Sequence, residues 1–132
     1  MNQIFDRLKP YSDLLGRILI AALFVIAGWG KIGDYAGTQQ YMAAMGVPAA
    51  LLPLVIALEL GGGIAIVLGL FTRPIALLLA GFSIVTALLF HGAGDQVNQI
   101  MLMKNVAIAG GFLFLVANGA GRISLDALRR PS

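Results

Sequence analysis

Four long apolar stretches separated by short polar segments dominate this chain, and charged side chains are almost excluded from them. Only seven charged residues lie between positions 14 and 121, whereas a soluble domain carries charge on about a quarter of its residues. A helix of about 20 apolar residues is long enough to cross the hydrocarbon core of a bilayer. The sequence therefore predicts an all-α integral membrane protein, a four-helix bundle in contact with the lipid bilayer.

The whole chain, residues 1–132, is predicted to form a single transmembrane domain with four spans. The spans cover about residues 14–33, 49–71, 74–91 and 100–119. Arg17 and Lys31 flank the first apolar stretch and can extend toward opposite headgroup layers, which lengthens the usable span. A cleaved signal peptide is the alternative for this stretch. The basic segment that precedes the stretch is long for a signal peptide, however, and further spans follow.

A polar segment of small residues, 34–48, separates the first two spans. Tyr41, Met42 and Met45 are spaced to share one face of a short helix that ends before Pro48. We predict that this helix lies in the membrane interface. A lid that gates the access of a substrate is the alternative interpretation.

The distribution of Lys and Arg predicts the orientation of the bundle. With the N-terminus in the cytoplasm, seven basic residues fall on the inner side and only two, Lys31 and Lys104, on the outer side. Both termini are therefore predicted to be cytoplasmic, which requires an even number of spans. The basic residues form no stripe with interleaved aromatic residues, so no nucleic-acid partner is expected.

The second span carries small residues at every fourth position: Ala57, Gly61, Ala65 and Gly69. Such a strip lets neighbouring helices approach closely in lipid, so we predict that it packs against another span. Glu59 lies on nearly the opposite side, together with Gly62, Gly63 and Ile66. With small residues on two faces, this span is predicted to be the most buried of the four.

Glu59 lies near the middle of the second span, where an ionised carboxylate costs about 2.5–3.5 kcal/mol on insertion scales. One interpretation is a carboxyl group that relays protons or binds a ligand in a polar pocket. The other is a protonated or ion-paired glutamate that only holds helices together. Glu59 is therefore a candidate catalytic residue and a candidate structural residue.

Polar residues gather at the predicted outer ends of the spans, and with Glu59 they line the outer half of the bundle. The candidate ligand-binding residues are Trp29, Lys31, Glu59, His91, Lys104 and Asn105. Simpler interpretations are an aromatic anchor in the interface for Trp29 and a helix cap for His91. Lys104 is either a snorkelling lysine or an ion-pair partner of Glu59, and Lys31 is the other possible partner. Because its side chain could transfer protons, His91 is the second candidate catalytic residue.

The chain has no cysteine and a single histidine. Iron–sulfur clusters, cysteine zinc sites and disulfides are therefore excluded, and bis-histidine haem ligation is impossible within one chain. No metal or haem is expected, so any redox role requires a cofactor from outside the chain.

Several short motifs occur in order along the chain: Ala27-Gly28-Trp29-Gly30-Lys31-Ile32, Glu59-Leu60-Gly61-Gly62-Gly63, Leu70-Phe71-Thr72-Arg73 and Met103-Lys104-Asn105. With His91 ending the third span, they resemble the DoxX family over nearly the whole chain. The segment Gly37-Thr38-Gln39-Gln40-Tyr41-Met42 is similar to the YqjF-like inner-membrane branch of that family. The resemblance implies a four-helix bundle in the inner (plasma) membrane of a bacterium. It also marks motif positions at Lys31, Glu59, Arg73, His91 and Asn105.

The resemblance further implies a redox setting, because a quinone-reducing thiosulfate oxidoreductase has DoxX-related subunits and other members are associated with oxidative-stress partners. Our leading hypothesis is a small membrane subunit or accessory protein of a redox or quinone-linked system, with a polar pocket that faces outward. The cofactor would be a quinone, and a redox partner protein would supply electrons. Glu59 would relay protons and Trp29 would stack on the ring. His91 or Lys31 would contact a quinone carbonyl.

Two other functional classes fit the same residues. One is a proton-coupled transporter or lipid-binding membrane protein, in which Glu59 couples protons to a hydrophobic solute. The other is a structural helper that stabilises another membrane complex or a homo-oligomer. The sequence leaves open whether the chain is an enzyme.

Overall fold

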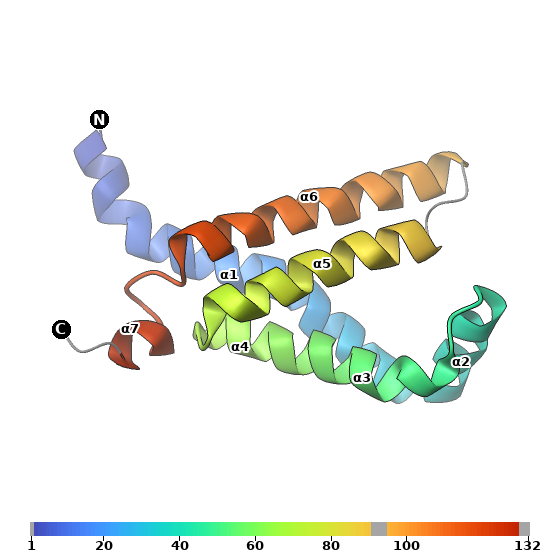
Figure 1. Ribbon diagram of the computed structural model, residues 1–132. Helices are drawn as coiled ribbons and strands as arrows, with labels where there is room; N and C mark the ends of the chain where they lie inside the picture. The colour runs from blue at the N-terminus through green and yellow to red at the C-terminus, as the bar shows by residue number, and fades with distance from the viewer. Residues whose placement is uncertain (1, 91–94, 130–132) are drawn as a thin grey trace.

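The computed structural model describes residues 2–90 and 95–129, and this part of the chain contains helices and no strands. Four of its helical segments are long and apolar enough to cross a membrane: Asn2–Gly33, Ala49–Leu68, Thr72–Phe90 and Gln96–Asn118. A shorter helix, α2 (Tyr35–Ala44), lies between the first two of them (Figure 1). The structure thus confirms an all-α four-helix membrane bundle with a short helix after the first span.

The first span, α1 (Asn2–Gly33), begins well before residue 14, where the sequence predicted its start. Exposed apolar side chains continue along one face of its early turns, at Ile4, Phe5, Leu8 and Tyr11. These turns include Pro10 and extend beyond the long helices of the other spans (Figure 1). The charged residues at this end therefore occupy the polar face of an amphipathic helix and do not end it.

The second span is not a uniform α-helix. It consists of a 3₁₀ turn η1 (Ala49–Leu51), α3 (Leu52–Ile56), a π-helical turn η2 (Ala57–Gly61) and α4 (Gly62–Leu68). Gly69 ends the span with a left-handed φ of 69°, and a short turn leads into α5 (Thr72–Phe90). Among the four candidate spans this one has the largest buried share, as predicted.

The predicted small-residue strip is wrong as a packing face. Ala57 and Gly61 are exposed, and Ala65 is only half-buried, so that Gly69 at the end of the span is the one buried member of the strip. The wider π turn adds a residue to the helix, so the positions before and after it are out of register with a period of four. The buried side is the opposite one, which carries Glu59, Gly62, Gly63 and Ile66.

The buried side of the second span packs closely against α1. A Cβ atom placed on Gly63 would lie 2.8 Å from Cγ2 of Val25. A Cβ atom placed on Gly28 of α1 would lie 2.9 Å from the backbone nitrogen of Leu60. Glycine permits this close approach, and shape and dispersion then hold the two helices together in lipid.

We expect Gly28→Ala to destabilise the bundle by about 1–3 kcal/mol, because the new methyl group meets backbone atoms of the second span. Gly30→Ala is the matched control, since a Cβ atom there meets nothing within 4 Å. The control should be neutral or slightly stabilising, because alanine favours the helix. Thermal unfolding in detergent measures both variants. Equal stability of the two would contradict the packing described.

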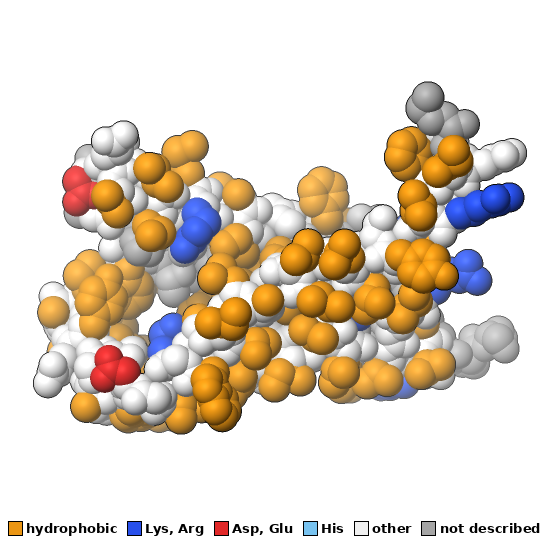
Figure 2. Space-filling view, turned by 180° about the vertical axis from the view of Figure 1, so that it is seen from behind, with side chains coloured by type: hydrophobic (Ala, Val, Ile, Leu, Met, Phe, Trp, Pro, Cys, Tyr) orange, Lys and Arg blue, Asp and Glu red, His pale blue; other side chains and the backbone are white. Residues whose placement is uncertain are grey.

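The third and fourth spans, α5 and α6 (Gln96–Asn118), lie side by side and form the most extensive helix pair (Figure 1). A buried cluster joins them to the first two spans, with Phe24 of α1 in edge contact with Phe112 of α6 at a centroid distance of 5.4 Å. Outside this cluster many large apolar side chains are exposed. Figure 2 shows them covering one flank of the bundle, as a lipid-facing surface requires.

The segment after α6 folds back against one end of the bundle and contains α7 (Leu125–Arg129) (Figure 1). The carboxylate of Asp126 accepts hydrogen bonds from the backbone nitrogens of Phe71 at 2.7 Å and Thr72 at 2.9 Å. The backbone nitrogen of Asp126 donates to the carbonyl of Gly69 at 2.8 Å. These bonds fasten the C-terminal segment to the turn between the second and third spans.

Arg17 of α1 fastens the same segment from another side. Its guanidinium donates to the carbonyls of Ile66 at 3.3 Å and Val67 at 3.2 Å, and to the carbonyl of Ile123 after α6. The Arg17 side chain is only 1% exposed. The prediction that it snorkels to a headgroup layer is wrong, because carbonyls at the end of α4 bind the guanidinium inside the fold.

The contribution of Asp126 to stability should depend on pH. Burial alone would raise its pKa, but hydrogen bonds from Thr72 and Phe71 and the charge of Arg129 outweigh burial and hold the pKa of Asp126 below its ordinary value of 3.8. The stabilisation is therefore complete above the ordinary pKa and is lost as the pH falls through the lower folded-state value. We expect Asp126→Asn to unfold at a lower temperature than the parent at neutral pH, with the two converging in acid. A difference that stays constant down to about pH 2 would contradict this assignment.

Candidate functional site

Lys31 and Glu59 form an ion pair inside the bundle. Nζ of Lys31 lies 2.7 Å from Oε1 of Glu59, and the two side chains are 29% and 6% exposed. Lys31 lies in the last turn of α1, three residues after Gly28, and Glu59 lies in the π-helical turn η2. The close approach of α1 to the second span therefore brings the lysine to the carboxylate.

The π-helical turn is the local feature that positions Glu59. Such turns interrupt the regular hydrogen-bond ladder of a helix and are frequent at functional sites. Here the turn falls in the most buried span and contains the only acidic residue of that span. The carboxyl group in this turn pairs with Lys31, and Glu59 lines a neighbouring cavity.

The cavity has a volume of about 480 Å³ and lies between α1, α2, the second span, α5 and α6. Most of its lining is apolar and includes Leu23, Phe24, Leu54, Leu58, Phe82 and Leu89. The polar and charged lining residues are few: Lys31, Thr38, Glu59, Ser83, Thr86, Lys104 and Asn105. An apolar chamber with a small number of convergent polar groups is the usual form of a small-molecule site.

Two of these polar groups are linked across α5 and α6. Nδ2 of Asn105 donates to Oγ1 of Thr86 at 3.3 Å, and the Thr86 hydroxyl donates to the carbonyl of Ser83 at 3.2 Å. Lys104 also lines the cavity, and no ion pair joins it to a carboxylate of the described residues. Glu59 thus pairs with Lys31, one of the two lysines, Lys31 and Lys104, that the sequence offered as its partner.

The short helix α2 forms one side of the cavity through Thr38, Tyr41 and Met42. The Tyr41 ring stacks on Phe90 of α5, with centroids 5.4 Å apart and planes inclined by 17°. Met42 is only 4% exposed. The connector between the first two spans is therefore part of the chamber wall.

Four of the six predicted ligand-binding residues line this cavity, namely Lys31, Glu59, Lys104 and Asn105. Trp29 does not, and its side chain is 70% exposed, as in an aromatic anchor of the interface. His91 lies outside the described residues. Sequence reasoning missed Ser83 and Thr86, although hydroxyl residues three positions apart on one face of an apolar span were an available signal.

Comparison with known proteins decides the family. The family model described as DoxX matches residues 12–92, which is more than half of the chain. The chain belongs to the DoxX family. The matched region of this DoxX-family protein contains both members of the Lys31–Glu59 pair, while Lys104 and Asn105 lie beyond it.

Relatives support the same assignment. The chain is 55% identical over 123 residues to the inner membrane protein YqjF of Escherichia coli (strain K12), covering 92% of this chain and 95% of the relative. It is 42% identical over 130 residues to the inner membrane protein YphA of the same organism, covering 92% and 93%. The predicted resemblance to the YqjF-like branch of the DoxX family is therefore confirmed.

A third relative has a name that mentions an activity. Over 80 residues the chain is 31% identical to "Putative oxidoreductase CatD" of Bacillus subtilis (strain 168), covering 61% of this chain and 57% of that protein. No solved structure matches this DoxX-family chain significantly.

Proposed function

We propose that this protein binds a quinone-like ring compound in the cavity beside Lys31 and Glu59. We also propose that it serves as a small inner-membrane subunit or accessory protein of a redox-linked system. The observation that carries the proposal is an ion pair in the wall of an otherwise apolar cavity of about 480 Å³. The redox part is supported by the word "oxidoreductase" in the name of the Bacillus subtilis relative.

The cavity lining fits the chemistry of such a ligand. A quinone has an apolar ring with carbonyl oxygens, and its reduction to the quinol takes up two electrons and two protons. The ammonium group of Lys104 and the amide of Asn105 are hydrogen-bond donors on the cavity wall. The leucine and phenylalanine side chains of the lining supply the apolar contact surface. Glu59 would hold or release a proton at its carboxyl group, and a partner protein would supply the electrons.

The proposal is tested by identifying what the purified protein retains. The parent is purified in a mild detergent, and extracted small molecules are identified by mass spectrometry. We expect a quinone in the parent and a loss of at least about tenfold in Glu59→Gln, because the amide cannot exchange a proton or pair with Lys31. Binding of added ubiquinone-1, followed by thermal shift, should weaken in parallel.

Asp6→Asn is the matched control for this experiment. It makes the same acid-to-amide change at an exposed position of α1, far from the cavity lining. We expect the control to retain as much quinone as the parent. A parent that retains only another lipid, or a Glu59→Gln variant that retains the quinone, would contradict the proposed function.

A further inference from the structure

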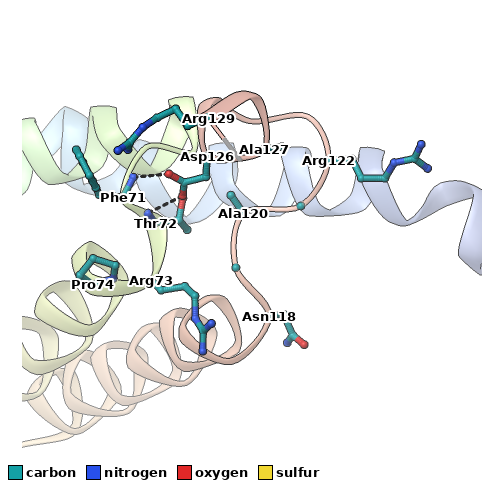
Figure 3. A pocket seen from close by; sticks show the side chains of 12 residues that line it. Phe71, Thr72, Arg73, Pro74, Asn118, Ala120, Arg122, Asp126, Ala127 and Arg129 are labelled. Atoms are coloured by element: carbon teal, nitrogen blue, oxygen red, sulfur yellow. Dashed lines mark hydrogen bonds between the residues drawn. The ribbon is translucent and has the colours of Figure 1, made fainter. Parts of the chain in front are cut away.

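The second and third spans form a V whose closed apex is the short turn between them. The carboxylate of Asp126 fastens this turn through the backbone nitrogens of Phe71 and Thr72 (Figure 3). On the apex side of the π-helical turn, α4 packs against α5, since a Cβ atom placed on Gly62 would lie 3.5 Å from Cδ2 of Leu79. On the other side of that turn, α3 and α5 diverge toward the end of the bundle where α2 lies (Figure 1).

The cavity beside Lys31 and Glu59 lies within this V and is exposed along one side. Leu54 of the second span and Val85 of α5 line the cavity, yet they are 67% and 52% exposed. Both residues lie inside helices that are long and apolar enough to cross the membrane. This side of the cavity therefore opens toward the hydrocarbon chains of the lipid and not toward water.

Helix α2 covers the wide end of the V. Its Tyr41 ring stacks on Phe90, the last residue of α5, and its Met42 lines the cavity while being only 4% exposed. The two diverging spans are thus bridged at the end that approaches the membrane surface. A ligand from the lipid reaches the cavity through the exposed side, whereas a ligand from water meets α2 first.

We propose that the ligand of this cavity is a membrane-soluble quinone with a hydrocarbon tail, and that the tail leaves the cavity sideways between Leu54 and Val85. This inference rests on the proposed function and names the class of quinone. Glu59 follows Leu54 along the second span toward the apex, so the ring lies deeper in the V, beside the ion pair. The tail passes the apolar walls and continues into the lipid, where it needs no polar partner.

The test compares two quinones with the same ring, added to the full chain in detergent. Decylubiquinone carries an alkyl tail, and ubiquinone-0 carries none. Val85→Trp and Leu54→Trp each place a bulky ring on one wall of the exit. Leu88→Trp is the matched control, because it makes the same change on α5 at an exposed position outside the cavity lining. Binding is followed by thermal shift, and each variant is compared with the parent for the same quinone, so that partition of the tail into micelles cancels.

We expect Val85→Trp and Leu54→Trp to lose at least about tenfold more affinity for decylubiquinone than for ubiquinone-0, because the tail then has no exit. Leu88→Trp should bind both quinones as the parent does. The inference is overturned if both exit variants bind decylubiquinone like the parent, if they lose affinity for the two quinones equally, or if Leu88→Trp shows the same selective loss. In those cases binding of ubiquinone-0 by the parent still supports the proposed function. A parent that binds neither quinone would overturn the proposed function and this inference together.

Discussion

Lys31→Met should destabilise the folded bundle by about 3 kcal/mol, because it leaves the carboxylate of Glu59 without a counter-charge. Removing one member of a buried ion pair typically costs about 3–5 kcal/mol. We take the lower end of this range because the Lys31 side chain is 29% exposed, whereas that of Glu59 is 6% exposed. Unfolding by heat or denaturant in detergent measures the effect.

A double variant separates the stranded charge from lost packing. Combining Lys31→Met with Glu59→Met removes both charges, so it should recover most of the stability. Lys9→Met is the control. It breaks the exposed ion pair between Nζ of Lys9 and Oδ2 of Asp13, which lie 2.8 Å apart. Such a surface pair contributes less than about 1 kcal/mol to stability. Equal losses of stability in Lys9→Met and Lys31→Met would contradict the prediction that burial makes the Lys31–Glu59 ion pair the more costly one to break.

Arg17→Met should destabilise the protein by at least about 3 kcal/mol. The substitution removes charge-assisted hydrogen bonds to three carbonyls, and each such bond is worth about 1.5–3 kcal/mol. Two of the carbonyls, those of Ile66 and Val67, belong to the last turn of α4. The Ile66 carbonyl would keep the backbone nitrogen of Gly69 at 3.1 Å as a donor, whereas the Val67 carbonyl would lose the Arg17 donor. Arg17→Lys should recover only part of the lost stability. The lysine ammonium group lacks the planar, branched donor geometry with which the guanidinium reaches both α4 and the C-terminal segment.

Limited proteolysis adds a second measurement, because the third carbonyl belongs to Ile123 in the C-terminal segment. We expect Arg17→Met to be cleaved faster than the parent between α6 and α7, even at temperatures where the bundle remains folded. Arg7→Met, an exposed arginine of the same helix, serves as the control and should behave as the parent. Unchanged stability and cleavage in Arg17→Met would show that Arg17 does not anchor the C-terminal segment.

The spans could be predicted from the sequence because their physical basis is simple. Charge is expelled from the hydrocarbon core, so the stretches without charge mark the spans. The same reasoning singled out Glu59 and the small residues beside it, Gly62 and Gly63, as one side of the second span, and that side is buried. Four of the polar residues that line the cavity, Lys31, Glu59, Lys104 and Asn105, were predicted because the topology places them in one half of the bundle.

The π-helical turn could not be predicted, and it reversed the interpretation of Gly61. A period of four assumes an uninterrupted α-helix, and no residue between Ala57 and Gly61 forces a wider turn by itself. The choice of Lys31 over Lys104 as the partner of Glu59 depends on how closely two helices pack. That distance is set by Gly28 meeting Leu60, which is a tertiary contact and has no local signal. Arg17 was misjudged because its partners are backbone carbonyls far away in the sequence.

The π-helical turn also divides the second span into two parts that can change separately. Before it, Leu54 and Val55 line the cavity, and after it, Gly63 and Ile66 belong to the seam with α1 and the core. Because the two parts are out of register, a substitution that reshapes the chamber does not alter the residues that hold the helices together. The shape of the chamber and the packing of the helices are therefore set by different residues of one span.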